Sequence, residues 1–395
     1  MRQDFFPALK KRLTQRLQLG EDTGDQEVLE QIDQLLDEAG HDSYLPVRER
    51  ERLRKELFFS VRRLDVLQEL LEDPGVTEIM VNGYEKIFVE RAGRVERWGK
   101  RFTSQEKLED VIQQIVGRCN RVVNENVPIV DARLADGARV NVVLPPVALD
   151  GAILTIRRFP EQPVTMERLL EWGSLTPEAA EFLRGLVRAG YSILIGGGTS
   201  TGKTTFLNAL SNYIPKGERL ITIEDNAELQ IQGVENLVRL EVKNANLEGA
   251  REISMRDLIK TALRMRPDRI VVAEVRGEEA MDLLQAWNTG HEGSLCTLHA
   301  NSCRDMVSRL ETMALMGMQL PLEAVRRQIA AGVEILVHLG RRGGQRRVLE
   351  IAEITGFQEA QVQTKPLYLW QEKKRRLERA GELCRREKLD REEEK

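Results

Sequence analysis

Residues 197–204 read G-G-T-S-T-G-K-T and match the G-x-x-x-x-G-K-[ST] pattern of a phosphate-binding loop. An apolar run at 193–195 precedes this loop, and residues 205–214 follow it with helical spacing, so the motif lies between a strand and a helix. The glycines allow backbone N–H groups to converge on phosphate oxygens, and the N-terminus of the helix adds the positive end of its dipole. We therefore expect Lys203 to neutralise the β- and γ-phosphates and the Thr204 hydroxyl to hold Mg²⁺.

The predicted ligands of this loop are ATP and Mg²⁺. The residues expected to bind them are Gly197, Gly198, Thr199, Ser200, Thr201, Gly202, Lys203, Thr204 and Thr205.

Two carboxylate clusters follow apolar, strand-like runs downstream of the loop. Glu224 and Asp225 come after residues 220–223, and Glu274 comes after residues 269–273. A parallel sheet gathers ligands at the carboxyl ends of its strands, where acidic residues can position Mg²⁺ and water. We predict that Glu274 orients or deprotonates the attacking water, that Glu224 and Asp225 assist around Mg²⁺, and that Glu274 and Asp225 approach the metal through water.

Two of the four histidines, His291 and His299, lie on either side of a strand-like run at 294–298. An imidazole in this region can hydrogen-bond to phosphate or to the attacking water. Together with Cys296 and Cys303, the spacing H-x₄-C-x₂-H-x₃-C also allows a zinc site. Alternate side chains of a strand face opposite ways, so these four groups would not converge, and phosphate sensing is the favoured role.

Composition limits the class of protein. The chain has 395 residues, a net charge of −4 and four cysteines. So few cysteines favour a reducing compartment over a disulfide-rich protein, and the negative net charge does not fit the basic surface typical of a nucleic-acid binder. No apolar stretch approaches the ~18 residues of a membrane span. We expect a cytoplasmic protein that is recruited to a membrane by a partner and has no direct nucleic-acid partner.

The apolar pattern divides the chain into five parts. A helical region at 1–72, with one run at 47–72, precedes a smaller domain at 73–160, whose alternating runs predict hairpins and a helix near 104–120. A proline-containing linker follows at 161–175, and residues 176–357 alternate strands with helices, as in a parallel sheet with crossover helices. Residues 358–395 are expected to form a charged tail that ends in a solvated helix or a frayed segment. The expected strands of the large domain are 192–195, 219–223, 269–273, 294–298 and 333–338.

The order of these motifs resembles the type II and type IV secretion and pilus-assembly ATPases, a GspE/PulE-like superfamily. The motifs that carry the resemblance are the phosphate loop, TIED at 222–225, IVVAEVRG at 270–277 and TGHEGSLCTLHAN at 289–301. Within this superfamily, GVTEIMVNG at 75–83 and DARLADGARVNVVLPPVALDG at 131–151 are similar to the CpaF-type ATPases of Flp (Tad) pili. The similarity runs from about residue 27 to residue 357.

The resemblance implies an α/β fold with a RecA-like P-loop C-terminal domain and a smaller α/β N-terminal domain behind a helical segment. It implies a hexameric motor that binds ATP between these domains. The motor would act on inner-membrane platform proteins, and indirectly on pilin, to extend or retract a type IV or Flp pilus or a related type II secretion filament. It also implies that Arg139, Arg157 and Arg158 reach the phosphates, with Arg133 a weaker candidate. Guanidinium suits this task because it is planar and permanently charged.

Two alternatives remain open at the level of sequence. The motifs overlap strongly with those of conjugative type IV secretion ATPases, so the same motor chemistry can serve a different machine. A nucleotide-gated assembly scaffold with little turnover is an alternative of another class, which a turnover assay would separate from a motor.

Overall fold

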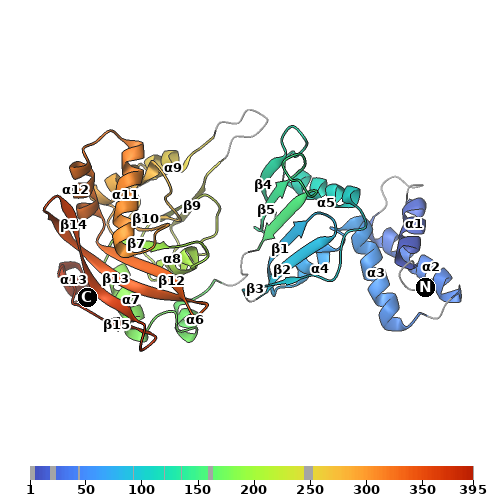
Figure 1. Ribbon diagram of the computed structural model, residues 1–395, viewed down its shortest axis with the longest axis horizontal. Helices are drawn as coiled ribbons and strands as arrows, with labels where there is room; N and C mark the ends of the chain where they lie inside the picture. Colours follow the sequence, from blue (N-terminus) through green and yellow to red (C-terminus); the bar gives the residue numbers. More distant parts are fainter. Residues whose placement is uncertain are drawn as a thin grey trace. The chain divides into compact units, whose positions relative to one another are not determined.

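The computed structural model describes residues 5–17, 24–42, 45–91, 93–119, 121–134, 136–158, 163–243 and 252–394. The chain forms two compact units, Met1–Pro160 and Glu161–Lys395, each with its own hydrophobic core (Figure 1). No helix in these ranges is both long and apolar enough to cross a membrane.

The first unit begins with three helices that share a small core. These are α1 (Phe5–Leu17), α2 (Asp25–Asp42) and α3 (Val47–Arg62), packed through leucine, isoleucine and valine side chains. The single helical run expected over 47–72 is wrong, because α3 ends at Arg62 and a separate helix, α4 (Leu67–Glu72), follows. Asp65, between them, has φ of 51°, a left-handed conformation that a continuous right-handed helix cannot contain.

A six-stranded antiparallel sheet completes the first unit, in the order β3-β2-β1-β6-β5-β4. Alternate residues of the four central strands, β1, β2, β5 and β6, are buried together with the apolar stripe of helix α5 (Gln105–Arg118), as the period of two in a half-buried strand requires. Ser104 caps the N-terminus of α5, because its hydroxyl accepts a hydrogen bond from the amide of Lys107. The strands are β1 (Val76–Asn82), β2 (Lys86–Arg91), β3 (Arg94–Arg97), β4 (Ile129–Arg133), β5 (Arg139–Val143) and β6 (Ile153–Arg157).

The second unit is built on a nine-stranded sheet in the order β15-β14-β13-β12-β7-β11-β10-β8-β9. The strands from β12 to β9 in this order are parallel, and β13, β14 and β15 extend the sheet in antiparallel fashion. The parallel register places the carboxyl ends of β7, β8, β10, β11 and β12 along one edge of the sheet. Their bounds are β7 (Ile193–Gly197), β8 (Leu220–Glu224), β9 (Leu237–Glu241), β10 (Arg269–Val272), β11 (Leu295–Leu298) and β12 (Ile335–Arg342).

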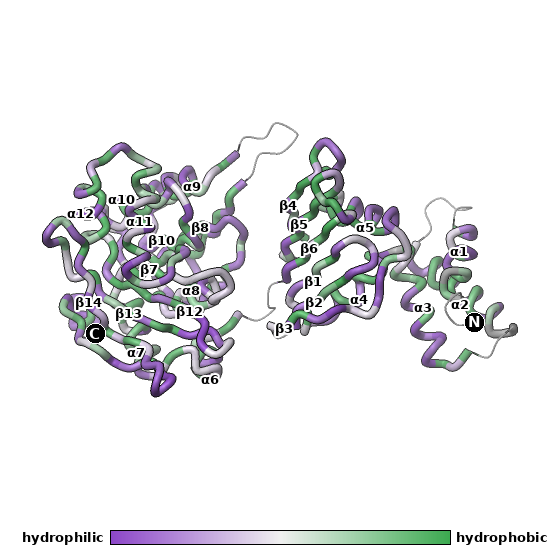
Figure 2. The backbone as a smooth tube through the Cα atoms, viewed as in Figure 1, coloured by the Kyte–Doolittle hydropathy of each residue, from purple (hydrophilic) through white to green (hydrophobic). Residues whose placement is uncertain are grey.

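Helices cover both faces of this sheet, which is why its central strands are continuous apolar runs (Figures 1 and 2). One core contains α9 (Met255–Ala262), α10 (Glu279–Asn288), α11 (Cys303–Gly317) and α12 (Leu322–Gly332). The other core contains α6 (Met166–Glu171), α7 (Pro177–Arg188), α8 (Lys203–Ser211) and α13 (Glu387–Glu393). The result is a layered α/β domain whose parallel strands end along one edge of the sheet.

The charged tail expected over 358–395 is wrong for most of its length. Strands β13 (Gln345–Gln358), β14 (Gln361–Gln371) and β15 (Arg376–Arg379) pair in sequence and belong to the main sheet. Leu367 and Leu377 are 1% and 2% exposed, so this segment contributes to the core. The charged residues that suggested a tail include those of the turn between β14 and β15, which are exposed to solvent.

The linker expected over 161–175 contains regular structure. Residues 161 and 162 lie outside the described part of the chain, and helix α6 occupies Met166–Glu171. The Thr165 hydroxyl accepts a hydrogen bond from the amide of Arg168 and so caps this helix. The segment is therefore part of the second unit and packs in its core through Met166 and Leu169.

Candidate nucleotide-binding and catalytic site

The phosphate loop joins β7 to α8, as the sequence predicts. A Cβ atom at Gly197 would lie 2.5 Å from Thr201 Oγ1 and 2.8 Å from the Leu339 carbonyl oxygen, so only glycine fits there. Gly202 has φ of 93° and stands immediately before the helix, again a conformation that favours glycine. Thr201 closes the loop by donating its hydroxyl to the Gly198 carbonyl at 2.9 Å. This compact turn, which ends at a helix N-terminus, fits a chain of phosphates.

Lys203, the first residue of α8, is 8% exposed, and its amine lies over the loop. Its Nζ is 3.4 Å from the Gly198 carbonyl oxygen, 3.3 Å from His299 Nδ1 and 3.6 Å from Glu274 Oε1. Burial lowers the pKa of Lys203, and the charge of Glu274 opposes that change. The structure thus brings three sequence-predicted residues, from α8 and from the ends of β10 and β11, to one point.

Glu274 is the carboxylate nearest to this point, and its two oxygens have different neighbours. Oε1 lies 2.9 Å from His299 Nε2 and faces Lys203. Oε2 accepts hydrogen bonds from Arg276 at 2.6 Å and 2.9 Å, and Arg276 also lies 3.4 Å from Asp225 Oδ2. Arg276 therefore links the two predicted acidic groups and fixes the orientation of Glu274. Arg276 is not among the residues predicted from the sequence, although its position two residues after Glu274 in A-E-V-R-G is an available signal.

The two predicted histidines lie at opposite ends of β11. His299 follows the carboxyl end, beside Lys203 and Glu274, and burial lowers its pKa while Glu274 opposes the change. The lowered pKa favours the neutral ring, in which one of the nitrogens can accept a hydrogen bond from Lys203. His291 precedes the amino end of β11, and its Nδ1 lies 3.2 Å from the Ala286 carbonyl oxygen. The structure does not bring His291 to the phosphate loop.

The zinc alternative receives no support from the geometry. In the described ranges, no group of three or more histidine, cysteine, aspartate or glutamate side chains is arranged to hold a metal ion. Cys296 and Cys303 are buried free thiols, and burial raises the pKa of both. A raised thiol pKa disfavours the thiolate that zinc requires.

Glu224, at the end of β8, is fully buried and organises the segment that follows it. Its Oε2 accepts hydrogen bonds from the amides of Glu228 at 2.7 Å and Leu229 at 2.8 Å. Its Oε1 is buried and has no hydrogen-bond partner within the part of the chain that the structure describes. Burial raises the pKa of Glu224, and the two backbone hydrogen bonds oppose that change. The geometry shows a structural task for Glu224, and its predicted part in catalysis stays a proposal.

We expect Glu224→Gln to raise the melting temperature at pH 8 by about 2 °C or more. The pKa of Glu224 is higher in the folded chain than its value of 4.5 in the unfolded chain, so protonation of this carboxyl stabilises the fold. This stabilisation is complete below pH 4.5 and is lost as the pH rises through the pKa of the folded chain. The ionised side chain is thus a cost at pH 8 that glutamine removes while it keeps an acceptor for the two amides. Thermal unfolding at pH 8 and pH 5 should show a difference that shrinks on acidification. Exposed Glu235, replaced by glutamine, is the control, and a lower melting temperature for Glu224→Gln at pH 8 would contradict this account.

The predicted arginines lie in the first unit. Arg133, Arg139 and Arg157 are register partners on the adjacent strands β4, β5 and β6, so their side chains share one face of that sheet. Arg157 is exposed. Arg158 Nη1, by contrast, donates hydrogen bonds to the carbonyl oxygens of Asp73 at 2.5 Å and Val76 at 3.4 Å. These bonds hold the Arg158 side chain against the backbone of the first unit.

Comparison with known protein families shows the family to which the chain belongs. The family model described as type II/IV secretion system protein matches residues 62–371. The chain belongs to this family. This secretion-family chain is similar to the type IV secretion system protein VirB11 of Brucella suis, with 34% identity over 303 residues that cover 70% of the chain and 84% of VirB11. It is also similar to the conjugal transfer protein TrbB of Rhizobium radiobacter, with 33% identity over 304 residues that cover 76% of the chain and 90% of TrbB.

Solved structures show the same fold as this secretion-family chain. The pilus retraction motor PilT with bound ADP superposes with a TM-score of 0.54 at 20% identity, covering 83% of the chain and 86% of PilT. The Legionella pneumophila ATPase DotB gives a TM-score of 0.52 at 21% identity, covering 73% of the chain and 79% of DotB. The predicted α/β fold, with its RecA-like domain, is thereby confirmed.

Proposed function

We propose that the protein is a motor ATPase of the type IV secretion kind, which hydrolyses ATP to power a membrane-associated conjugation or secretion machine. The cluster of Lys203, Glu274 and His299 beside the phosphate loop supports this proposal most directly, because a cation, a carboxylate and an imidazole within 4 Å of one another suit a γ-phosphate and an attacking water. Membership in a family of secretion ATPases supports the same activity.

The residues of the loop fit MgATP. Lys203 would neutralise the β- and γ-phosphates, and the Thr204 hydroxyl would hold Mg²⁺, which supplies charge stabilisation when bound. Glu274 Oε1 would orient the attacking water or take its proton, since Arg276 already engages Oε2. Asp225 would act near the metal through water, and His299 would hydrogen-bond to the γ-phosphate.

The assembly and partners belong to the same proposal. We propose a homo-hexamer that works on the cytoplasmic face of the inner membrane through platform proteins. The names of the matched relatives support only a part in conjugal transfer or type IV secretion. Assignment to Flp (Tad) pili remains a prediction from the sequence motifs alone. The names of the relatives TrbB and VirB11 favour the alternative of a conjugative or type IV secretion system. Neighbouring genes would distinguish the two, since pilin and platform genes indicate a pilus, whereas relaxase and coupling genes indicate conjugation.

The function is tested by the rate of phosphate release from ATP by the full chain, with Mg²⁺ and with excess EDTA, over a range of protein concentrations. A motor predicts Mg²⁺-dependent turnover that increases per subunit as the ring assembles, which light scattering can follow. Tight ATP binding with no turnover at any concentration would instead establish the scaffold alternative.

We expect Arg157→Ala and Arg139→Ala to lower kcat by about 10²-fold or more while ADP binding is retained. The physical reason is that these arginines would stabilise charge in the transition state, whereas the phosphate loop that binds ADP lies in the other unit. Arg97→Ala is a matched control, because Arg97 lies on β3 at the opposite edge of the same sheet. Wild-type kcat in both arginine variants would refute their role.

A further inference from the structure

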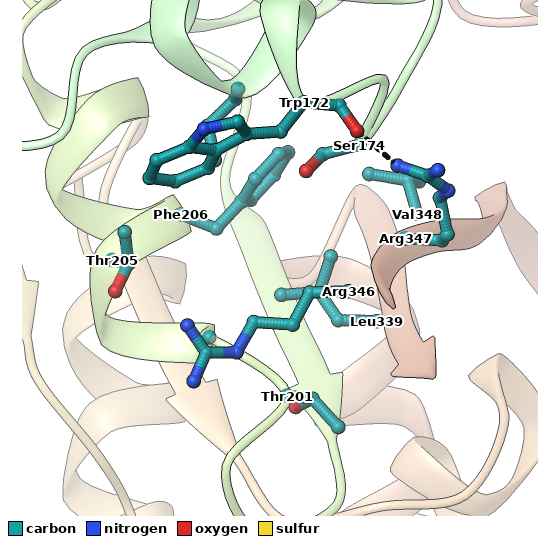
Figure 3. A pocket seen from close by; sticks show the side chains of 11 residues that line it. Trp172, Ser174, Thr201, Thr205, Phe206, Leu339, Arg346, Arg347 and Val348 are labelled. Carbon is teal, nitrogen blue, oxygen red and sulfur yellow. Dashed lines mark hydrogen bonds between the residues drawn. The ribbon is translucent and has the colours of Figure 1, made fainter. Parts of the chain in front are cut away.

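A cleft opens on one flank of the phosphate loop, within the second unit (Figure 3). It has about 370 Å³ of space, and it lies between the end of α6, the start of α8 and the hairpin of β12 and β13. Trp172 and Phe206 form one part of its wall, and Arg346 and Val348 another. The cleft is open to solvent, and its volume includes the solvent space at its mouth.

The cleft lies toward the α-phosphate end of the loop. Lys203 reaches the β- and γ-phosphates in a loop of this type, and its amine is directed toward Glu274 and His299. The cleft is lined instead by Thr201, Gly202 and Thr205, which are loop and helix residues that do not belong to that cluster. A nucleotide whose γ-phosphate lies near Glu274 would therefore extend its sugar and base toward the cleft.

Trp172 presents an aromatic surface to this space. Trp172 is 46% exposed, an unusual state for tryptophan, and the Arg168 guanidinium lies 5.4 Å from the ring centroid. Its carbonyl oxygen accepts a hydrogen bond from Arg347, which fixes the backbone at the end of α6. An indole held in this way can stack on a planar base.

Arg346 joins the wall of the cleft to the tip of the phosphate loop. Its Nε donates to the Ser200 carbonyl at 3.1 Å, and Arg341 Nη2 donates to the same oxygen at 3.1 Å. The two arginines are register partners across the β12–β13 hairpin. Ser200 has φ of 59°, a conformation that a non-glycine residue keeps only when its surroundings hold it.

We propose that this cleft is the nucleoside subsite of the enzyme, with Trp172 stacking on the base of ATP and Arg346 holding the tip of the phosphate loop against the bound nucleotide. The inference rests on the proposed function, because it takes ATP as the ligand of the loop. It assigns two different tasks, base recognition to Trp172 and loop positioning to Arg346.

These tasks can be separated by titrating full-length protein with ADP and with inorganic pyrophosphate, both with Mg²⁺, in a calorimeter. Trp172→Ala should weaken ADP binding by about tenfold and leave pyrophosphate binding unchanged, because pyrophosphate has no base. Trp172→Phe should retain most of the ADP affinity. Arg346→Ala should weaken the binding of both ligands, since both need the phosphate loop. Arg342→Ala is the matched control, because Arg342 lies on the same hairpin but pairs with Glu372 at 2.6 Å.

The outcomes distinguish the subsite from the function on which it rests. Unchanged ADP affinity in Trp172→Ala, or equal weakening of ADP and pyrophosphate, would overturn stacking on Trp172 while ATP binding stands. Equal effects of Arg346→Ala and Arg342→Ala would overturn the positioning role of Arg346. If the wild-type protein bound neither ligand, the proposed function itself would fail.

Discussion

Replacing Lys203 by alanine is expected to lower kcat/KM for ATP by about 10³-fold. The amine lies within 4 Å of both Glu274 and His299, and in a loop of this type it contacts the β- and γ-phosphates. The substitution also leaves the negative charge of Glu274 beside the phosphates without the positive charge of Lys203. Both the affinity for ATP and the rate of the chemical step should therefore decrease. Steady-state phosphate release and ADP titration would measure the two effects separately.

A matched control is Lys374→Ala, since Lys374 lies in the turn before β15 with a 60% exposed side chain paired to Glu378. It should leave kcat/KM within about twofold of wild type, because an exposed ion pair contributes little. Wild-type hydrolysis by Lys203→Ala would show that the loop does not bind the triphosphate. A folded-state check by circular dichroism is needed, because Lys203 is largely buried.

The strands that carry the site were predictable because each is buried on both faces. Such strands read as short continuous apolar runs, and the run expected at 269–273 is β10 (Arg269–Val272) in the structure. The antiparallel extension was not predictable in the same way. Strand β15 buries only Leu377 among charged neighbours, so its composition resembles that of a solvated segment, and only pairing with β14 makes it a strand.

The candidate site was predictable where residues follow directly from strand ends. Glu274 and His299 follow adjacent parallel strands, whose carboxyl ends must meet at one edge of the sheet. His291 could not share that position, because the four residues of β11 separate it from His299 by about 13 Å along the strand. Arg341 and Arg346 could not be connected to Ser200 from spacing alone, since the contact depends on β12 pairing with β7.

Glu274→Gln is expected to lower kcat by about 10²- to 10³-fold while ATP binding is retained or strengthened. Glutamine keeps the shape of the side chain and can still accept hydrogen bonds from Arg276, but its amide cannot take a proton from water. The carboxylate is 15% exposed, with Oε1 directed at Lys203 and His299 and Oε2 held by Arg276. Only Oε1 is therefore placed for the attacking water, so the loss should appear in the chemical step.

Single-turnover hydrolysis of a limiting amount of ATP by excess enzyme isolates that step from product release. Glu278→Gln is a suitable control, because Glu278 lies four residues further along, is 53% exposed and pairs with Arg256 instead of with the loop. A near-normal single-turnover rate in Glu274→Gln would exclude this carboxylate as the base and leave Asp225, which lies 3.4 Å from the Arg276 guanidinium, as the next candidate. A parallel loss of kcat and ATP affinity would instead mean that Glu274 acts by holding Lys203 in place, because only a role confined to the transition state leaves binding intact.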